Sequence, residues 1–384
     1  MKICKIDDCV GCGLCQNVCP RNAITMVFNQ QGFLQPQVDS EKCIKCFLCR
    51  NKCLVNTKKT IKDFKNTNEL HFYSAKSPNS NLVRISSSGG VFGEIMNYFL
   101  NRHLKNVSIY GAQYTDVFFV KHAKTDNKEL VASFHGSKYN QSDTSNTYKS
   151  VKKDLNLGKM VVFSGTPCQV FALKRFLGKD YNNLFAVDFL CHGVMSSTVL
   201  KDYVKYYVKN DVTTINMRSK EIESSYSSFV VKNNDDILYS ENFQDSSFGL
   251  GYAFGTGIIN RKSCEKCIFR NANRYSDITL GDFVEGKTKS KIKNQSICVC
   301  NTLKGYNLLN EINIELDKLE NEDLQFTIER LTDKKYYSYK RKKFFKSYQK
   351  NGITDQSISL FKYTKGDKFY SYLKRIGAIF KNGE

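Results

Sequence analysis

Cysteine is the residue type through which this sequence is best equipped to do chemistry. The chain has 384 residues and 15 cysteines, and nine of them fall within its first 53 residues. Eight of these nine form two runs with one shared spacing, C-x-x-C-x-x-C-x-x-x-C. The runs consist of Cys9, Cys12, Cys15 and Cys19, and of Cys43, Cys46, Cys49 and Cys53. Repeated thiolates this close together indicate metal or redox chemistry.

The spacing of the two runs predicts two 4Fe-4S clusters, the pattern of bacterial ferredoxins. Thiolates at every third position wrap three corners of a cubane, while the fourth cysteine reaches the other cluster. Zinc is the alternative, but zinc sites usually use two C-x-x-C pairs, so the repeated triple run favours iron–sulfur. Cys4 lies outside both runs and is expected to be a free, partly buried thiol. The predicted ligand sets are Cys9, Cys12 and Cys15 with Cys53, and Cys43, Cys46 and Cys49 with Cys19.

Composition limits the class of protein. The chain is 41% hydrophobic and 25% charged, and no apolar stretch approaches the roughly 20 residues of a membrane span. The N-terminus lacks the apolar region of a secretory signal, so we expect a cytoplasmic protein. The net charge is +21, and residues 330–384 contribute 15 Lys and Arg against 4 Asp and Glu. Because this excess is uneven and metal-bound thiolates offset part of it, we do not expect a nucleic-acid partner.

The distribution of residue types predicts four segments. Residues 1–55 form a small ferredoxin-like domain with two 4Fe-4S clusters, and polar residues 56–80 form a linker. Residues 81–315 form a larger domain, and residues 316–384 form a basic, aromatic-rich extension. The larger domain alternates buried strands with helices, which predicts an α/β (mixed α+β) fold. The stretch YNLLNEINIELDKL, residues 306–319, reads as a helix.

Four cysteines of the larger domain could make a third metal site. Cys168 and Cys191 each follow a predicted buried strand, and ligands gather at the carboxyl ends of such strands. Cys264 and Cys267 form a C-x-x-C pair that could join them from another loop. A rival set combines that pair with Cys298 and Cys300 in a zinc site.

Six short motifs occur in order: SSSGG (86–90), HGSKYNQS (135–142), GTPCQ (165–169), CHGV (191–194), CEKC (264–267) and DITLGDF (277–283). Together they make the chain resemble the coenzyme F(420) hydrogenase/dehydrogenase beta subunit family. The resemblance implies FAD beside a third 4Fe-4S cluster, with the cluster held by Cys168, Cys191, Cys264 and Cys267. It also implies that the motifs bracket the flavin. The residues expected at the flavin are Ser88, Gly89, Gly90, Gly136, Ser137, Lys138, Gly281 and Asp282.

The flavin residues have a physical rationale. The glycines of SSSGG precede a predicted helix, and bare amides at a helix N-terminus suit a pyrophosphate. Lys138 would add positive charge. His192 is a candidate proton donor, since imidazole titrates near neutral pH, but a structural role fits it and His135 equally well. The catalytic residues therefore stay unassigned.

The resemblance implies an oxidoreductase, with electrons moving between the clusters, FAD and a small molecule. That molecule is either deazaflavin coenzyme F(420) or an organic substrate such as a polysaccharide precursor. The implied protein partner is a ferredoxin or a dehydrogenase subunit. The alternative is a non-catalytic subunit that relays electrons to a partner enzyme.

Two interpretations of residues 334–350, where Lys and Arg alternate with Tyr and Phe, stay open. The segment either makes peripheral contact with an anionic membrane, or it is a solvated helix docked by its aromatic residues.

Overall fold

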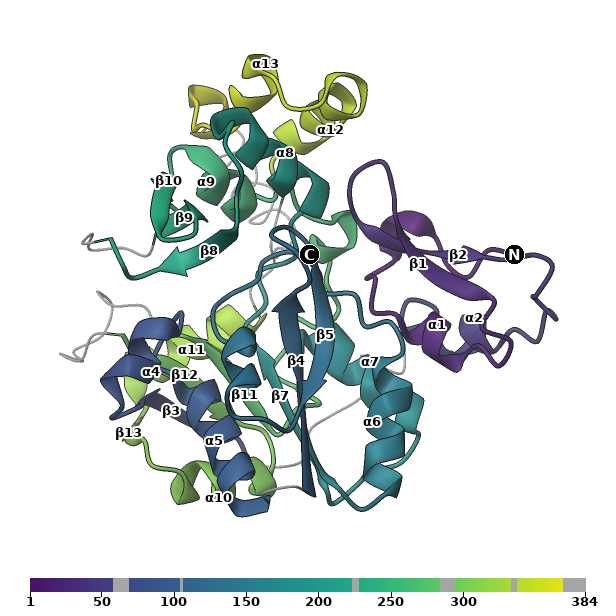
Figure 1. The fold of residues 1–384 in the computed structure, drawn as a ribbon, viewed down its shortest axis with the longest axis vertical. Coiled ribbons are helices and arrows are strands. Elements are labelled where there is room, and N and C mark those ends of the chain that lie inside the picture. The colour runs from purple at the N-terminus through teal and green to yellow at the C-terminus, as the bar shows by residue number, and fades with distance from the viewer. Residues whose placement is uncertain (58–68, 104–105, 223–227, 284–293, 333–336, 369–384) are drawn as a thin grey trace, which may run out of the picture.

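The computed structural model describes residues 1–57, 69–103, 106–222, 228–283, 294–332 and 337–368 (Figure 1). It contains a small N-terminal module, a large mixed sheet with helices on both faces, and a second small sheet with its own helices. The predicted fold class, a ferredoxin-type domain followed by a larger α/β domain, is confirmed. Within the described residues, no helix has both the length and the apolar character that crossing a membrane would need.

The N-terminal module repeats one short pattern twice. A cysteine loop leads into α1 (Leu14–Val18), and a second loop leads into α2 (Leu48–Lys52). Between them lies an antiparallel hairpin of β1 (Ile24–Phe28) and β2 (Leu34–Val38), and a 3-10 turn, η1 (Ile6–Asp8), precedes the first loop. Both helices are short, so they bring the fourth cysteine of each run back beside the other loop.

The large sheet has eight strands in the order β13-β3-β12-β11-β7-β6-β4-β5. Four adjacent central strands are parallel: β4 (Val107–Tyr114), β6 (Met160–Ser164), β7 (Leu184–Phe189) and β11 (Ile278–Asp282). Antiparallel strands flank them. These are β5 (Val120–Thr125) at one edge, and β12 (Ser296–Cys300), β3 (His71–Lys76) and β13 (Glu315–Lys318) at the other.

Helices cover both faces of this sheet, as expected for buried parallel strands. The apolar residues of α6 (Thr147–Asn156) and α7 (Pro167–Leu177) pack on one face with Val161 and Phe163. On the other face, α5 (Val91–His103) and α10 (Leu303–Glu311) pack with Val162. Neighbouring residues of β6 thus serve opposite layers, because side chains alternate along a strand.

The second sheet lies above the first in Figure 1. It consists of β8 (Thr214–Ser219), β9 (Ser228–Asn233) and β10 (Asp236–Asn242). Its core includes residues of α8 (Ser197–Tyr207), α9 (Gly249–Gly255) and α12 (Lys340–Asn351), and the short helix α13 (Asp355–Ile358) contacts α12. The remaining elements are α4 (Ser80–Ile85), η3 (Leu130–Phe134), η4 (Lys262–Cys264) and α11 (Asn321–Thr332).

Two segments differ from the sequence prediction. Residues 71–76, placed in the linker, form β3 inside the large sheet, while residues 58–68 lie outside the described ranges. The helix expected over 306–319 ends at Glu311, and the chain continues as β13. The reason is visible in the alternation of Ile312, Ile314 and Leu316, which is the two-residue period of a strand.

The basic C-terminal segment is packed rather than free. Phe344, Phe345 and Tyr348 on α12 are buried in the core of the second sheet. Lys342, Lys343 and other polar residues of α12 face solvent. These aromatic residues of α12 are therefore part of the hydrophobic core. This matches the interpretation of a solvated helix that docks through an aromatic stripe. Residues 334–336 lie outside the described ranges.

Candidate functional site

The fold brings the eight cysteines of the N-terminal module into two groups. Burial raises the pKa of Cys15, and the nearby thiols of Cys9 and Cys53 raise it further. Burial also raises the pKa of Cys12, again with Cys15, Cys9 and Cys53 close by. One group is therefore Cys9, Cys12 and Cys15 with Cys53.

The second group contains the remaining four cysteines of the module. Cys49 has a pKa raised by burial and by the neighbouring Cys19, Cys46 and Cys43. The same four thiols line one small cavity. In each group, three cysteines come from one run and the fourth from the other, which is the predicted crossed arrangement.

Cys4, expected to be a free thiol, lies against the first group. It contacts both Cys9 and Cys53, and hydrogen bonding from Cys4 lowers the pKa of Cys9 to about 6 and that of Cys53 to about 7. The side chain of Cys4 is partly buried. Its position five residues before Cys9 gave no sign of this contact.

Four further cysteines line a cavity in the larger domain. Cys168 stands in the first turn of α7 and Cys191 follows β7, while Cys264 and Cys267 come from the segment that begins with η4. Burial raises the pKa of Cys168, and Cys267, Cys12 and Cys191 contribute to the shift. The structure thus brings this group together and places it next to Cys12 of the N-terminal module.

The rival zinc set does not assemble. Cys298 and Cys300 lie on β12 with no exposed surface, in the core between the large sheet, α5 and α10. Cys298 is paired with Leu280 on one neighbouring strand and Tyr73 on the other. Neither thiol lines the cavity that contains Cys264 and Cys267. Both behave as small apolar side chains.

A seam of hydrogen bonds holds the first cysteine loop against the larger domain. We call the donors Gln141, Thr144, Tyr148, Arg261 and Ser263 the seam residues. Gln141 donates to the carbonyls of Val10 at 2.7 Å and Gly11 at 2.9 Å. Thr144 at 3.2 Å and Tyr148 at 2.7 Å both donate to the carbonyl of Cys12. Arg261 at 3.1 Å and Ser263 at 3.0 Å donate to that of Cys9, and Arg261 also reaches Leu34 at 2.8 Å.

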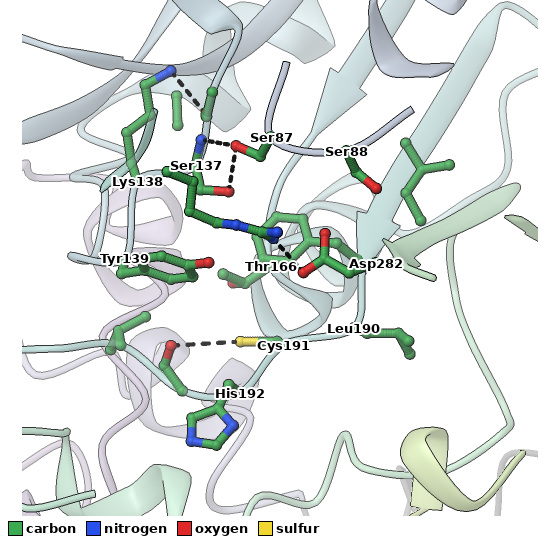
Figure 2. Close-up of a pocket in the computed structure, with 18 of the residues that line it drawn as sticks. Ser87, Ser88, Ser137, Lys138, Tyr139, Thr166, Leu190, Cys191, His192 and Asp282 are labelled. Carbon is green, nitrogen blue, oxygen red and sulfur yellow. Dashed lines mark hydrogen bonds and ion pairs between the residues drawn. The ribbon is translucent and has the colours of Figure 1, made fainter. Parts of the chain in front are cut away.

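A cavity with a volume of about 790 Å³, which we call the large cavity, opens at the carboxyl ends of β6, β7 and β11. Figure 2 shows Cys191 and His192 at one end of it and Ser87, Ser88 and Lys138 at the other. Of the eight residues predicted at the flavin, seven line this cavity: Ser88, Gly90, Gly136, Ser137, Lys138, Gly281 and Asp282. The cavity is large, partly apolar and edged by polar groups, as binding sites for small molecules and cofactors are.

Gly89 lies behind the cavity wall. Its amide donates to Oγ of Ser296 at 2.9 Å, and its carbonyl accepts from the amide of Ser77 at 2.7 Å. A Cβ atom at Gly89 would lie 2.5 Å from the carbonyl oxygen of Ala75 and 2.8 Å from the amide nitrogen of Ser296. The glycine is therefore required for a close approach between the SSSGG loop and the sheet.

Gly89→Ala is expected to destabilise the protein by about 1–3 kcal/mol, because both obstructing atoms belong to the backbone and cannot rotate away. Urea unfolding of the purified protein measures this loss. Gly255→Ala is the matched control, since a Cβ atom there meets nothing within 4 Å. Equal stability of the two variants would contradict the close approach.

One lysine lines the end of the cavity near Ser88, and a second contacts the backbone of Ser88 itself. The ammonium of Lys138 donates to the carbonyls of His135 at 2.7 Å and Ser133 at 2.9 Å, and burial lowers its pKa to about 7. Lys138 is thus occupied by the backbone rather than extended toward a ligand. Lys220 donates to the carbonyl of Ser88 at 2.9 Å, and burial lowers its pKa to about 8.

Sequence reasoning missed three residues of the cavity region. Arg218 lines the cavity and forms an ion pair with Asp282. Lys220 directly follows β8 and donates to the carbonyl of Ser88, a residue that lines the cavity. Tyr139 stacks on Phe243 with ring centroids 5.1 Å apart. Tyr139 lay within a quoted motif, whereas the two cations lie at the end of β8, a strand that no motif covered.

The two candidate histidines are held by different contacts. Nε2 of His192 lies 2.9 Å from the carbonyl of Gly255, and its ring packs on Phe254 with centroids 5.1 Å apart. Burial lowers the pKa of His135 to about 4, and the nearby Lys138 adds to this shift. His135 is therefore neutral near pH 7. Of the two histidines, His192 is the one that directly follows Cys191 in the chain.

The cysteine cavity and the large cavity adjoin. Thr166, Cys191, Gly193, Val194 and Arg330 line both. Oγ1 of Thr166 also lies 3.1 Å from the sulfur of Cys168. A group bound by the four thiols would be separated from a ligand in the large cavity by one layer of residues.

Comparison with known proteins identifies two parts of the chain. A family model for the C-terminal part of coenzyme F(420) hydrogenase/dehydrogenase beta subunits matches residues 158–325, and a 4Fe-4S dicluster domain matches residues 8–57. A chain of the F(420)-reducing NiFe hydrogenase complex from Methanosarcina barkeri shares 17% identity at a TM-score of 0.48, over 69% of this chain and 88% of that chain. No curated protein matches. The two matched ranges contain all twelve cysteines of the three groups.

Proposed function

Because the chain belongs to the coenzyme F(420) hydrogenase/dehydrogenase beta subunit family and carries a 4Fe-4S domain at its N-terminus, we propose that it is an iron–sulfur flavoprotein oxidoreductase. Electrons pass between two clusters in the N-terminal module, a third cluster in the larger domain, and FAD in the large cavity. The observation that carries this proposal is the shared wall of the two adjoining cavities, formed by residues such as Thr166 and Cys191.

The three cysteine groups fit three clusters. Each offers four neighbouring thiols, and four thiolates are the donor set of a 4Fe-4S cubane. Two guanidinium groups, those of Arg270 and Arg274, line the cavity of the third group. Other nitrogens of these groups contact the carbonyl of His192 at 2.8 Å and Asp188 at 3.8 Å, whereas Nη1 of Arg270 and Nε of Arg274 are buried with no hydrogen-bond partner among the described residues. Positive charge at this cavity suits the negative charge of a thiolate-bound cluster. The contact between the Cys12 and Cys168 regions makes the first group the neighbour of the third.

The large cavity fits a flavin. Bound there, FAD would convert single electrons into hydride or two-electron chemistry. The N-terminus of α5 and the hydroxyls of Ser87 and Ser137, which hydrogen-bond one another at 2.8 Å, would bind the pyrophosphate. The Tyr139 ring offers an apolar face in the cavity wall, and Arg218 would hold a negative group on the ring or the substrate. His192 is placed to donate or accept a proton near Cys191.

The substrate is either coenzyme F(420) or an organic molecule such as a polysaccharide precursor. A cavity of about 790 Å³ favours an enzyme over the alternative of a simple electron relay, because a relay needs no such space. The proposal also places the protein in the reducing cytoplasm, where thiols stay available for metal. All fifteen cysteines are free of disulfides in the structure.

Metal and flavin analysis of anaerobically purified or reconstituted protein tests this function. We expect about twelve iron atoms and about one FAD per chain, from three 4Fe-4S clusters and one flavin site. Redox titration with F(420) and with candidate organic substrates then identifies the partner of the flavin. Twelve iron atoms without flavin, even after reconstitution with FAD, would support the relay instead.

A further inference from the structure

The two cysteine loops of the N-terminal module share a backbone conformation but differ at two positions. The first loop has Gly11 at φ +65° and Gly13 at φ +72°. The equivalent positions of the second loop are Lys45 at φ +54° and Phe47 at φ +60°. Left-handed backbone costs a residue with a Cβ atom roughly 1–2 kcal/mol. The second loop therefore keeps two side chains where glycine would relieve strain.

Packing explains the glycines of the first loop. A Cβ atom at Gly11 would lie 2.4 Å from Oε1 of Gln141, and one at Gly13 would lie 2.0 Å from Oγ1 of Thr144. The first loop thus faces the seam residues. Lys45 and Phe47 are exposed instead. Backbone strain that packing does not explain tends to mark functional sites. The exposed side chains of Lys45 and Phe47 therefore indicate a function at the surface of the second loop.

The surface around them has an apolar centre and a basic rim. Ile44 is 61% exposed, Phe47 45% and Leu48 42%. Residues 39–53 include four Lys and Arg against two acidic residues. Lys42, Lys45 and Arg50 are exposed, and Lys42 forms an ion pair with Asp39 at 3.1 Å. We call this patch the Ile44–Leu48 surface, with Lys42 and Arg50 as its rim. Contiguous exposed apolar side chains edged by polar groups are typical of protein interaction sites.

The Ile44–Leu48 surface lies directly over the second cysteine group. Cys46 within it is exposed, and Ile44, Lys45, Phe47 and Leu48 line the same small cavity as the four thiols. In Figure 1, α2 is at the outer edge of the molecule, on the side away from β3 and β13. A protein bound here would contact the cluster that is farthest from the large cavity along the chain of three groups.

We propose that the Ile44–Leu48 surface is the docking site of a small one-electron carrier protein with an acidic surface. This inference rests on the proposed function and adds the place at which electrons arrive. In each docking event the reduced carrier would lose one electron, which a cluster held by Cys19, Cys43, Cys46 and Cys49 would accept. Two such events would supply two electrons, which with one proton from solvent make one hydride equivalent at the flavin in the large cavity.

Stopped-flow reduction of the anaerobic holoprotein by a reduced acidic bacterial ferredoxin tests the docking site. Lys45→Glu and Ile44→Ser are expected to lower the second-order rate constant about tenfold, because an interface charge and an apolar contact control association. The wild-type rate should fall as ionic strength rises from about 0.05 M to about 0.3 M, since salt screens attraction between exposed charges. The Lys45→Glu rate should fall less.

Lys45→Gly separates docking from folding. Glycine suits the left-handed backbone, so this variant should be at least as stable as the wild type and still accept electrons more slowly. Asn234→Gly is the matched control, since Asn234 is exposed at φ +51° in the turn between β9 and β10. Lys318→Glu, an exposed charge reversal on β13, controls for net charge. Neither control should change the rate.

Reduction by dithionite distinguishes the two proposals. If dithionite reduces the clusters and the flavin to the same final extent in all variants, while ferredoxin rates differ as expected, both proposals stand. Equal ferredoxin rates for Lys45→Glu, Lys45→Gly and the wild type would overturn the docking site and leave the oxidoreductase intact. Protein without a reducible cluster would overturn the proposed function itself.

Discussion

Cys168→Ser should remove about four of about twelve iron atoms, because one thiolate of the third 4Fe-4S cluster is lost while the eight cysteines of the N-terminal module remain. Cys168 lines the same cavity as Cys191, Cys264 and Cys267, so these three would be left with an incomplete ligand set. The flavin should still bind, since its cavity is formed by other residues. Iron and FAD analysis of the anaerobic variant measures both quantities.

Cys298→Ala provides the control for this loss. Cys298 is fully buried in the apolar core and lies outside the cysteine cavity, so all the iron should remain. The Cys168 variant should also lose transfer from a reduced ferredoxin to the flavin, while the N-terminal clusters are still reduced. Unchanged iron in Cys168→Ser, or iron lost equally in Cys298→Ala, would refute the assignment of the third ligand set.

Removing two seam residues should separate the N-terminal clusters from the third. In the double variant Gln141→Ala with Arg261→Met, carbonyls of Val10, Gly11 and Leu34 lose their donors. Leaving buried carbonyls unpaired should weaken docking of the module by about 3 kcal/mol, which raises the undocked fraction roughly 100-fold. All cluster ligands remain, so the iron content should not change.

Two measurements follow the undocked state. Flavin reduction by ferredoxin should slow, because electron transfer falls steeply with distance, and proteolytic separation of residues 1–57 from the larger domain should become faster. Lys149→Ala is the control, since the Lys149 side chain makes an exposed hydrogen bond, at 2.8 Å, to Asn22 of the module. A double variant that transfers electrons at the wild-type rate would show that the seam is not needed for the electron path.

The repeated cysteine spacing carried most of what could be predicted. It indicated the ferredoxin-like module and the crossing of the fourth cysteine, because thiolate spacing along a short loop constrains which groups can share a centre. The strands at 160–164 and 184–189 were also predictable, since fully buried parallel strands read as continuous apolar runs. Both predictions concern local sequence.

Long-range features were not readable from the sequence. Nothing local showed that β3 would insert between β12 and β13, because the pairing partners lie more than 200 residues away. Arg218 and Asp282 meet across 64 residues. The hydrogen bonds of the seam residues could not be predicted from the sequence either. Their acceptors are backbone carbonyls, which every residue carries.

The seam has a consequence for how such a protein can evolve. On the module's side it uses main-chain carbonyls and the absence of side chains at Gly11 and Gly13, so it recognises the shape of the loop and few of its side chains. A ferredoxin module of quite different sequence could be grafted onto the same larger domain, provided that it kept those two glycines and two further contacts. These are Gly32, where a Cβ atom would lie 2.0 Å from Oγ1 of Thr198, and Asn17, whose side-chain amide donates to the carbonyl of Ser145 at 2.7 Å. The second loop needs no glycine at the equivalent positions, Lys45 and Phe47. Its sequence can therefore change to match the carrier protein of a given host.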